Sequence, residues 1–542
     1  MAEQKQEKKK FSLVKEIVRW VFCGLLTLLL IAALIVQAPG KIVTLLVVFL
    51  LACAALPRRA RKLFWLSTAA VGIVLIIWVF LPEDNEAWRP YTFDEELAAL
   101  QAKYSVPDEE NAALIYDKLF ETMNGDQNEP EFFLQSSPSS KDEPWLSKDH
   151  PEMAEWLTGH QHKITMLLEA AKKDKCHFPT PSDPWRFGQY TERLPEIRRC
   201  AFLLVCAANN DLAEGRVDQA IKKNLTILQM AKHQCQQPMM IDMLVGTAIE
   251  SLATEQFNRF VLTNDATEER LSVIEQALAD IKHDWGSDLP RFLEGEKLLA
   301  KNTVCSSAYQ RNAQGKSRLS RDPMEVFRTH FPEEVPPLTY WQTKLAKAAT
   351  VLGWLVMPAT AQKAGRIIDE CYEKYQSTSE PNFVWQEKLP PRFSMPKSCY
   401  QVRFNYRYFA NLIADMWIDS LYRARDLYPR LLTENRGSRI IIALRRYKNK
   451  TGHWAESLEE VESFALAEIF IDPMNGSSFV YKLTDDSFTL YSKGKNNIDE
   501  AGEYETGWDA DYSGYKVKED DHLIWPPKSH KTKKENIDAE QQ

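Results

Sequence analysis

Few residues of this sequence have the types and spacing that enzyme chemistry needs. Gly315-Lys316-Ser317 has the letters that end a phosphate-binding loop, in which backbone N–H groups and a lysine hold the phosphates. Gln310, however, stands where such a loop needs its first glycine, and no apolar strand precedes it. The sequence also lacks Gly-x-Gly-x-x-Gly, His-Glu-x-x-His and Gly-x-Ser-x-Gly. We therefore assign no catalytic residue and no cofactor-binding residue.

Histidine and cysteine side chains, the usual ligands of transition metals, are scattered along the chain. His160 and His162 form the one close histidine pair. They are two residues apart, on different faces of a helix, which favours surface residues over metal ligands. Seven of the nine cysteines follow residue 82, and none belongs to a Cys-x-x-Cys pair. We expect mostly buried free thiols, with one or two disulfides as the alternative.

The distribution of charge along the chain is uneven and gives a first indication of how the protein is organised. The chain has 542 residues, with 67 basic and 75 acidic side chains, and 44% of its residues are apolar. This composition excludes wholesale disorder, collagen and a small disulfide scaffold. Residues 1–82 hold 11 basic and 3 acidic side chains, which leaves 56 basic and 72 acidic for the rest. Because phosphate backbones attract basic surfaces, the acidic body argues against a nucleic-acid partner.

Residues 1–82 contain three uncharged, largely apolar runs, at 20–40, 42–57 and 63–82. A helix needs about 20 apolar residues to cross a bilayer, and the first and third runs reach that length. The second run is shorter, so a buried or re-entrant helix is its alternative. Basic residues before the first run and at 58–62, with acidic residues after the third, place the N-terminus in the cytoplasm. We expect three transmembrane helices that make this an integral inner (plasma) membrane protein, with an extracytoplasmic body.

Residues 83–400 are predicted to form a mainly helical body with Pro- and Ser-rich loops. Apolar residues recur at helical spacing over 194–213, and again over 219–234 after a turn at Gly215. This hairpin is similar to a tetratricopeptide-type unit, but no fixed period repeats, so a compact bundle and a short helical array both stay open. Further segments are expected as two helices within 93–123, helices at 152–175, at 238–262 and from Thr267, a polar loop at 305–322, and a helix at 402–448 with a break at Pro429.

The segment 401–526 is expected to hold a helix followed by a small sheet. Residues 479–483 and 487–491 alternate with period 2, and turn residues separate them, which predicts an antiparallel hairpin. The last residues, 527–542, form a charged tail that we expect to be disordered. The predicted fold class is thus membrane-anchored and mainly α, with a small C-terminal α+β module.

The order of residues in this module resembles the C-terminal half of the major pseudopilins of type II secretion. The shared features are a helix with Tyr447, then Gly452, a Ser-Leu pair, an Asp472-Pro473-x-x-Gly476 turn, a hairpin, a Ser-x-Gly and an acidic loop. They cover about 85 of the 542 residues. The whole chain also resembles uncharacterised bacterial membrane-anchored helical proteins, which imply no activity. Three apolar runs in place of one assembly helix argue against a processed pilus subunit.

The resemblance implies a calcium site, because the acidic loop after Ser-x-Gly binds calcium in that family. The matching stretch holds Asn496, Asn497, Asp499 and Glu500, with Asp509 and Asp511 downstream. Calcium is bound by several oxygen ligands, carboxylates among them, and this loop can supply them. From that match we take Asp499, Asp509 and Asp511 as calcium ligands. The loop is longer than that of the family over 503–518, and a solvated acidic loop is the alternative.

Two classes of function remain. The first is a membrane-anchored, extracytoplasmic interaction or scaffold protein of the bacterial cell envelope, whose helical body binds a protein partner. The resemblance implies a link to secretion or pilus-type machinery. The alternative is an envelope enzyme of the hydrolase type, with a site assembled from dispersed residues. A deep pocket with pKa-shifted groups would favour the enzyme, and a shallow groove would favour the interaction protein.

Overall fold

The computed structural model describes residues 88–123, 130, 133, 139–180, 190–263, 265–320, 360–378, 406–484, 487–509 and 514–527. The chain divides into two compact units. The smaller unit takes 1–90, 307–361 and 398–406, and the larger takes 91–306, 362–397 and 407–542. The predicted boundaries after residues 82 and 400 fall outside the described residues.

The described residues correct the predicted membrane-anchored fold class to a mainly helical fold with small antiparallel sheets. No helix in this part of the chain combines the length and the apolar character that a bilayer crossing needs. Helix α12 (Met240–Val261) shows why, because its 22 residues include Asp242, Glu250 and Glu255. The same finding overturns the predicted inner-membrane localisation. The three runs at 20–40, 42–57 and 63–82 themselves lie outside the described residues.

The smaller unit contains a three-stranded antiparallel sheet in the order β1 (Arg89–Pro90), β2 (Tyr309–Arg311) and β3 (Ser317–Leu319). Strands β2 and β3 form a hairpin inside the segment 305–322, which we expected to be a loop. Gly315 has a φ of 80° in its turn, a conformation that suits a residue without Cβ. Gly315-Lys316-Ser317 therefore serves a β-turn, as expected of a chance match to a phosphate-binding motif.

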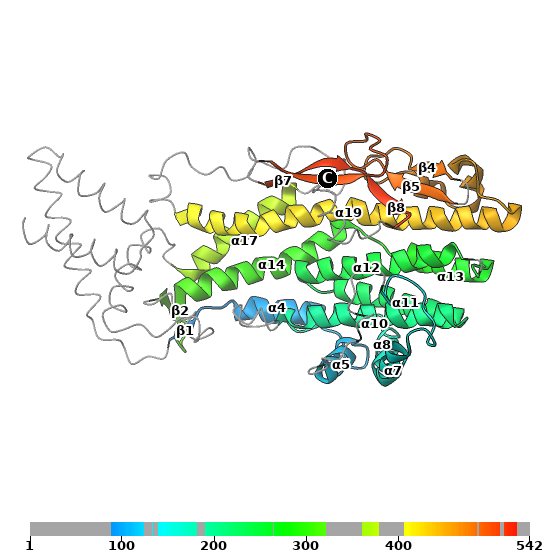
Figure 1. Cartoon of the computed structure of the whole chain (residues 1–542). Coiled ribbons are helices and arrows are strands. Elements are labelled where there is room, and N and C mark those ends of the chain that lie inside the picture. The colour runs from blue at the N-terminus through cyan, green and yellow to red at the C-terminus, as the bar shows by residue number, and fades with distance from the viewer. Residues whose placement is uncertain are drawn as a thin grey trace, which may run out of the picture. The chain divides into compact units, whose positions relative to one another are not determined.

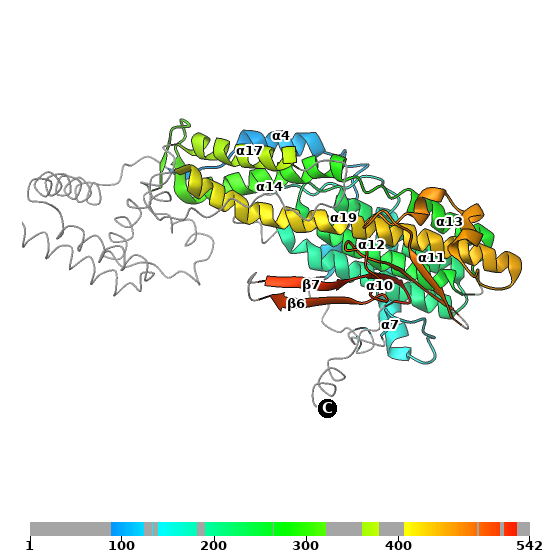
Figure 2. The ribbon, with the colours of Figure 1, turned by 90° about the horizontal axis from the view of Figure 1, so that it is seen from above.

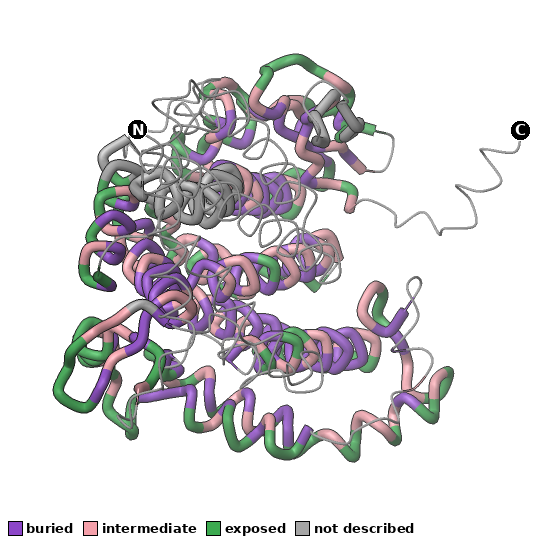
Figure 3. The backbone as a smooth tube through the Cα atoms, turned by 90° about the vertical axis from the view of Figure 1, so that its left-hand side faces the viewer, coloured by how far each residue is buried: buried purple, intermediate pink, exposed green. Residues whose placement is uncertain are grey.

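The centre of the larger unit is the predicted helical hairpin and the helix after it. Helix α10 (Arg193–Ala213) and helix α11 (Val217–Cys235) meet at Gly215, and α12 packs against both (Figure 1). Their apolar stripes face one another, as the helical periodicity predicted. Figure 3 shows the same pattern along the backbone, with buried residues on the facing sides of neighbouring helices.

Further helices surround this centre. One set comes from the first part of the unit: α4 (Asp94–Tyr104), α5 (Ala113–Met123), α7 (Pro151–Gly159) and α8 (Gln161–Ala170). Helices α7 and α8 replace the single helix expected at 152–175, because the chain turns at His160. The other set is α13 (Glu268–Ala279), α14 (Trp285–Ala308) and α17 (Ala361–Thr378). Figure 2 shows α4 and α17 beside α14.

Helix α19 (Tyr406–Thr451) has 46 residues and continues through Pro429, so the predicted break there is wrong. Proline removes one backbone hydrogen bond from a helix interior, but neighbouring contacts can hold the helix in place. Asn435 donates to the Leu278 carbonyl of α13 at 2.9 Å, and Arg446 pairs with Glu268 at 2.9 Å. Tyr428, just before the proline, donates to Asp288 of α14 at 2.9 Å, so tertiary contacts flank Pro429 and outweigh the local preference.

The predicted C-terminal hairpin is confirmed as β4 (Val480–Leu483) and β5 (Phe488–Ser492), with Val480 opposite Tyr491. Strand β8 (His522–Trp525) completes this sheet in the order β4-β5-β8. A separate antiparallel ribbon, β6 (Tyr504–Asp509) with β7 (Gly514–Asp520), occupies part of the expected acidic loop.

The sheet packs on α19, where a Cβ at Gly437 would lie 2.4 Å from Ile524. Two short 3-10 helices, Leu458–Phe464 and Ala467–Phe470, lead from α19 to β4. Buried side chains of the sheet, among them Phe488, Leu490 and Ile524, belong to the same apolar core as α5, α10 and α12. One continuous apolar cluster, the main core, therefore extends from Ala112 to Ile524.

Candidate functional site

Of the three predicted calcium ligands, Asp499 is the one whose side chain lies among the described residues. The Asp499 carboxylate accepts a hydrogen bond from the Tyr491 hydroxyl at 2.6 Å and one from the Ala501 N–H at 3.0 Å. These bonds, with Lys482 at 3.7 Å, hold the pKa of Asp499 below its usual range. The side chain of Asp509 and the whole of Asp511 lie outside the described residues.

Two other carboxylates, Asp520 and Asp521, close the loop that was expected to bind calcium. Asp520 Oδ2 accepts the Lys495 N–H at 2.8 Å, and Asp521 Oδ2 accepts the N–H groups of Glu500 at 2.9 Å and Gly502 at 2.8 Å. Burial raises the pKa of Asp521 to about 6. Sequence reasoning did not select this acidic pair, because 19 to 25 residues separate it from the loop residues that it contacts.

The oxygen set for a cation at this loop is incomplete in the described part of the chain. The Oδ1 atoms of Asp520 and Asp521 are buried without a hydrogen-bond partner, which suits a cation. Yet no three or more His, Cys, Asp or Glu side chains among the described residues are arranged to hold a metal ion. The calcium site therefore stays a prediction of the resemblance.

The histidine and cysteine side chains considered as metal ligands or reactive groups instead make packing contacts and local hydrogen bonds. His160 stacks on Trp156 with ring centroids 4.2 Å apart, while His162 is exposed and its Nδ1 lies 3.1 Å from the Gly159 carbonyl. Cys200 and Cys206 are buried free thiols. Burial raises the pKa of each to about 12, so neither is a thiolate at neutral pH.

A buried ion pair that the sequence did not reveal joins the start of α10 to α12. Arg193 Nη2 donates to Asp242 Oδ1 at 2.6 Å, and the Tyr190 hydroxyl donates to Asp242 Oδ2 at 2.6 Å. The guanidinium also lies 4.3 Å from the ring centroid of Phe178. Burial lowers the pKa of Arg193, but the charge of Asp242 more than offsets this and raises it. The pair is a neutralised structural contact, and neither member is available as an acid or base.

His233 is the second buried group that could suggest chemistry. Its Nε2 lies 2.7 Å from the Lys173 carbonyl, so it must carry the proton, and Nδ1 then accepts from the Tyr116 hydroxyl at 2.9 Å. Burial lowers the pKa of His233 to about 4. The neutral ring thus connects α11 to α5 and to the segment that follows α8.

This depressed pKa makes a prediction for acid stability. The pKa of His233 is about 6.5 in the unfolded chain and about 4 in the native protein. Between these two pH values the unfolded chain binds a proton at His233 and the native protein does not. The free energy of unfolding should therefore drop by about 2 kcal/mol between pH 7 and pH 5 through this residue. Urea unfolding at both pH values should show that His233→Gln loses this part of the difference. Equal pH dependence in the two proteins would refute the assignment.

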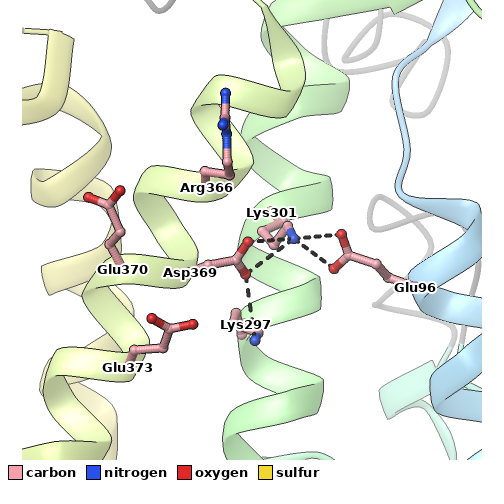
Figure 4. Close-up of a pocket in the computed structure, with 7 residues that line it drawn as sticks. All are labelled: Glu96, Lys297, Lys301, Arg366, Asp369, Glu370 and Glu373. Atoms are coloured by element: carbon pink, nitrogen blue, oxygen red, sulfur yellow. Dashed lines mark hydrogen bonds and ion pairs between the residues drawn. The ribbon is translucent and has the colours of Figure 1, made fainter.

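A pocket of about 400 Å³ lies between α4, α14 and α17 (Figure 4). Only charged side chains line it, and these are Glu96, Lys297, Lys301, Arg366, Asp369, Glu370 and Glu373. Lys301 is 3% exposed, and its Nζ lies 2.6 Å from Glu96 and 3.0 Å from Asp369. Lys297 approaches the same Asp369 at 3.5 Å. Two lysines of α14 are thus paired with carboxylates of α4 and α17.

The rest of the pocket is open for a ligand. Arg366, Glu370 and Glu373 are exposed on α17 and make no hydrogen bond or ion pair with other described residues. Their spacing of four and then three residues places them on one helix face. The sequence signal was present in this spacing, but the partners Glu96 and Lys301 are too far away in sequence to be linked to it.

The pocket can bind through charge, but it lacks the arrangement of an active site. A catalytic nucleophile or base must be free to exchange a proton with its substrate, and the buried Lys301 is instead fixed between two carboxylates. Comparisons of this chain with protein-family models, with curated proteins and with solved structures found no match.

Proposed function

We propose that this chain is an interaction or scaffold protein, and that a protein partner binds at the charged pocket between α4, α14 and α17. The observation that carries this proposal is the character of the pocket, which is open and lined by charged side chains alone. An enzyme site more often combines apolar walls with a few convergent polar groups. The hydrolase alternative has no comparable support, because the buried Asp242 is already paired with Arg193.

Charge complementarity indicates the kind of partner. Inside the pocket, Lys297 and Lys301 are matched by Glu96 and Asp369. The carboxylates of Glu370 and Glu373 outnumber the remaining Arg366 in the lining. We therefore expect a partner segment that presents Lys or Arg side chains to the exposed face of α17, with binding that weakens as salt is added.

Site-specific photo-crosslinking in the producing cells tests this proposal. A photoreactive residue at Glu370 or Glu373 should give a discrete adduct, whereas the same residue at the exposed Glu269 of α13 should not. The double charge reversal Glu370→Lys/Glu373→Lys should weaken binding of the crosslinked partner about tenfold, which is about 1.4 kcal/mol. The proposal fails if all three positions give the same adducts, or if the double reversal binds the partner as the parent does.

A further inference from the structure

A buried His–Glu pair lies at the junction of α12 and the link between α13 and α14. His283 belongs to that link, and its Nε2 lies 2.7 Å from Glu250 Oε1 of α12. The two side chains are only 8% and 7% exposed. At this distance and burial the contact is a charge-assisted hydrogen bond if His283 is protonated.

Glu250 has no other hydrogen bond or ion pair among the described residues. Its charge is therefore compensated only while His283 carries a proton. If His283 became neutral, the carboxylate would be left buried without a cation, which is strongly unfavourable. The stability of this junction must then depend on the protonation of one imidazole ring.

The groups that face the pair come from every element packed around it. Helix α14 supplies Asp288 and Arg291, which pair at 2.7 Å. Helix α19 supplies Tyr428, whose ring is edge-on to His283 at 5.9 Å and whose hydroxyl donates to Asp288 at 2.9 Å. Helix α11 supplies the partly buried Cys235, and desolvation of its thiol raises its pKa and keeps it neutral.

One further ionisable pair lies near this junction. Glu434 of α19 accepts from Ser251 at 2.6 Å and lies 3.2 Å from His522 of β8, so its charge has its own partner. Burial lowers the pKa of His283, but its bond to Glu250 and the charges of Glu250, Asp288 and Glu434 outweigh burial and raise it. The surrounding charges thus favour the protonated ring at neutral pH.

We propose that His283 and Glu250 form a proton-dependent clasp that fastens the α13–α14 link to α12 and opens when His283 loses its proton. The direction of the effect follows from the raised pKa of the native state. The stabilisation is complete below about 6.5, the value in an unfolded chain, and is lost as the pH rises through the native pKa. The clasp is independent of the partner proposed for the charged pocket.

Hydrogen–deuterium exchange of the full chain at pH 6 and pH 9, corrected for the intrinsic exchange rate, tests the clasp. Backbone protection over 281–290 should fall at least tenfold at the higher pH in the parent protein. His283→Gln keeps a neutral donor toward Glu250, and its protection should be the same at both pH values. The matched control His522→Gln, at the neighbouring pair, should retain the response of the parent.

A second measurement needs no variant and covers the case in which His283→Gln does not fold. Deuterium exchange at the imidazole Cε1 position, followed by peptide mass spectrometry, gives the pKa of each histidine in the native protein. The clasp requires a His283 pKa above 6.5. A value of 6.5 or lower, or protection over 281–290 that is unchanged between pH 6 and pH 9, would overturn the proposal.

Discussion

Asp242→Asn should lower the free energy of unfolding by about 3 to 5 kcal/mol at pH 7, the cost typical of breaking a buried ion pair from one side. The carboxylate is fully buried, and Arg193, 9% exposed, has its strongest contact with it. Asparagine keeps the size of the side chain and can still accept from the Tyr190 hydroxyl. What it removes is the charge, so the guanidinium remains buried between aromatic rings with no anion. Urea unfolding followed by circular dichroism measures the loss.

Two further variants separate the charge effect from other causes. Asp218→Asn breaks the exposed pair with Arg270, and it should cost at most about 1 kcal/mol because water screens such pairs. The double replacement Arg193→Met/Asp242→Leu removes both buried charges, and it should recover most of the stability lost in Asp242→Asn. If Asp242→Asn is as mild as Asp218→Asn, the buried pair does not hold α10 to α12 as we infer.

Gly295→Ala should destabilise the protein by about 3 kcal/mol, although alanine is favoured over glycine in helices by up to about 1 kcal/mol. Gly295 lies in the middle of α14, where that helix crosses the connection between α11 and α12. A Cβ at this position would lie 1.9 Å from the Pro238 carbonyl oxygen and 2.8 Å from Met239 Sδ. The first contact is with a backbone atom, which cannot move away by a change of rotamer as a side chain can. Helix α14 would have to move, and with it Lys297 and Lys301 of the charged pocket.

Gly159→Ala is the matched control for this prediction. Gly159 ends helix α7, and a Cβ there would meet nothing within 4 Å. Its replacement should be neutral or slightly stabilising, because only the helical preference of alanine remains. Thermal unfolding of the two variants beside the parent should therefore give shifts of opposite sign or very different size. A Gly295→Ala protein as stable as Gly159→Ala would mean that α14 does not approach Pro238 this closely.

Local periodicity predicted much of the larger unit. The hairpin of α10 and α11 follows from apolar residues at helical spacing on both sides of Gly215, and β4 with β5 follows from alternation around a short turn. In these segments the apolar residues of the local pattern are the ones that the fold buries, so the pattern alone predicts the element. The α13 start at Glu268 was likewise predicted from the residues after Thr267.

The features that could not be predicted from the sequence depend on contacts between distant residues. Pro429 locally favours a break, but Tyr428 before it contacts α14 and Asn435 after it contacts α13, and these contacts keep the helix continuous. Strand β1 pairs with β2, which is more than 200 residues away in the sequence, so no local pattern predicts it. The pairs Arg193–Asp242 and Lys301–Glu96 were missed for the same reason. Each charged residue alone is typical of a solvent-facing position, and only the fold shows its partner.

The main core, which extends from Ala112 to Ile524, has a consequence for how the protein is made. Ribosomes add roughly 5 to 20 residues per second, so roughly 20 to 80 seconds separate the synthesis of the first and last core residues. During that interval α5, α10 and α12 exist without the strands that complete their shared interior. The apolar faces of these helices must stay in solution or on a chaperone until β8 leaves the ribosome. Folding of the larger unit is thus completed only near the end of translation.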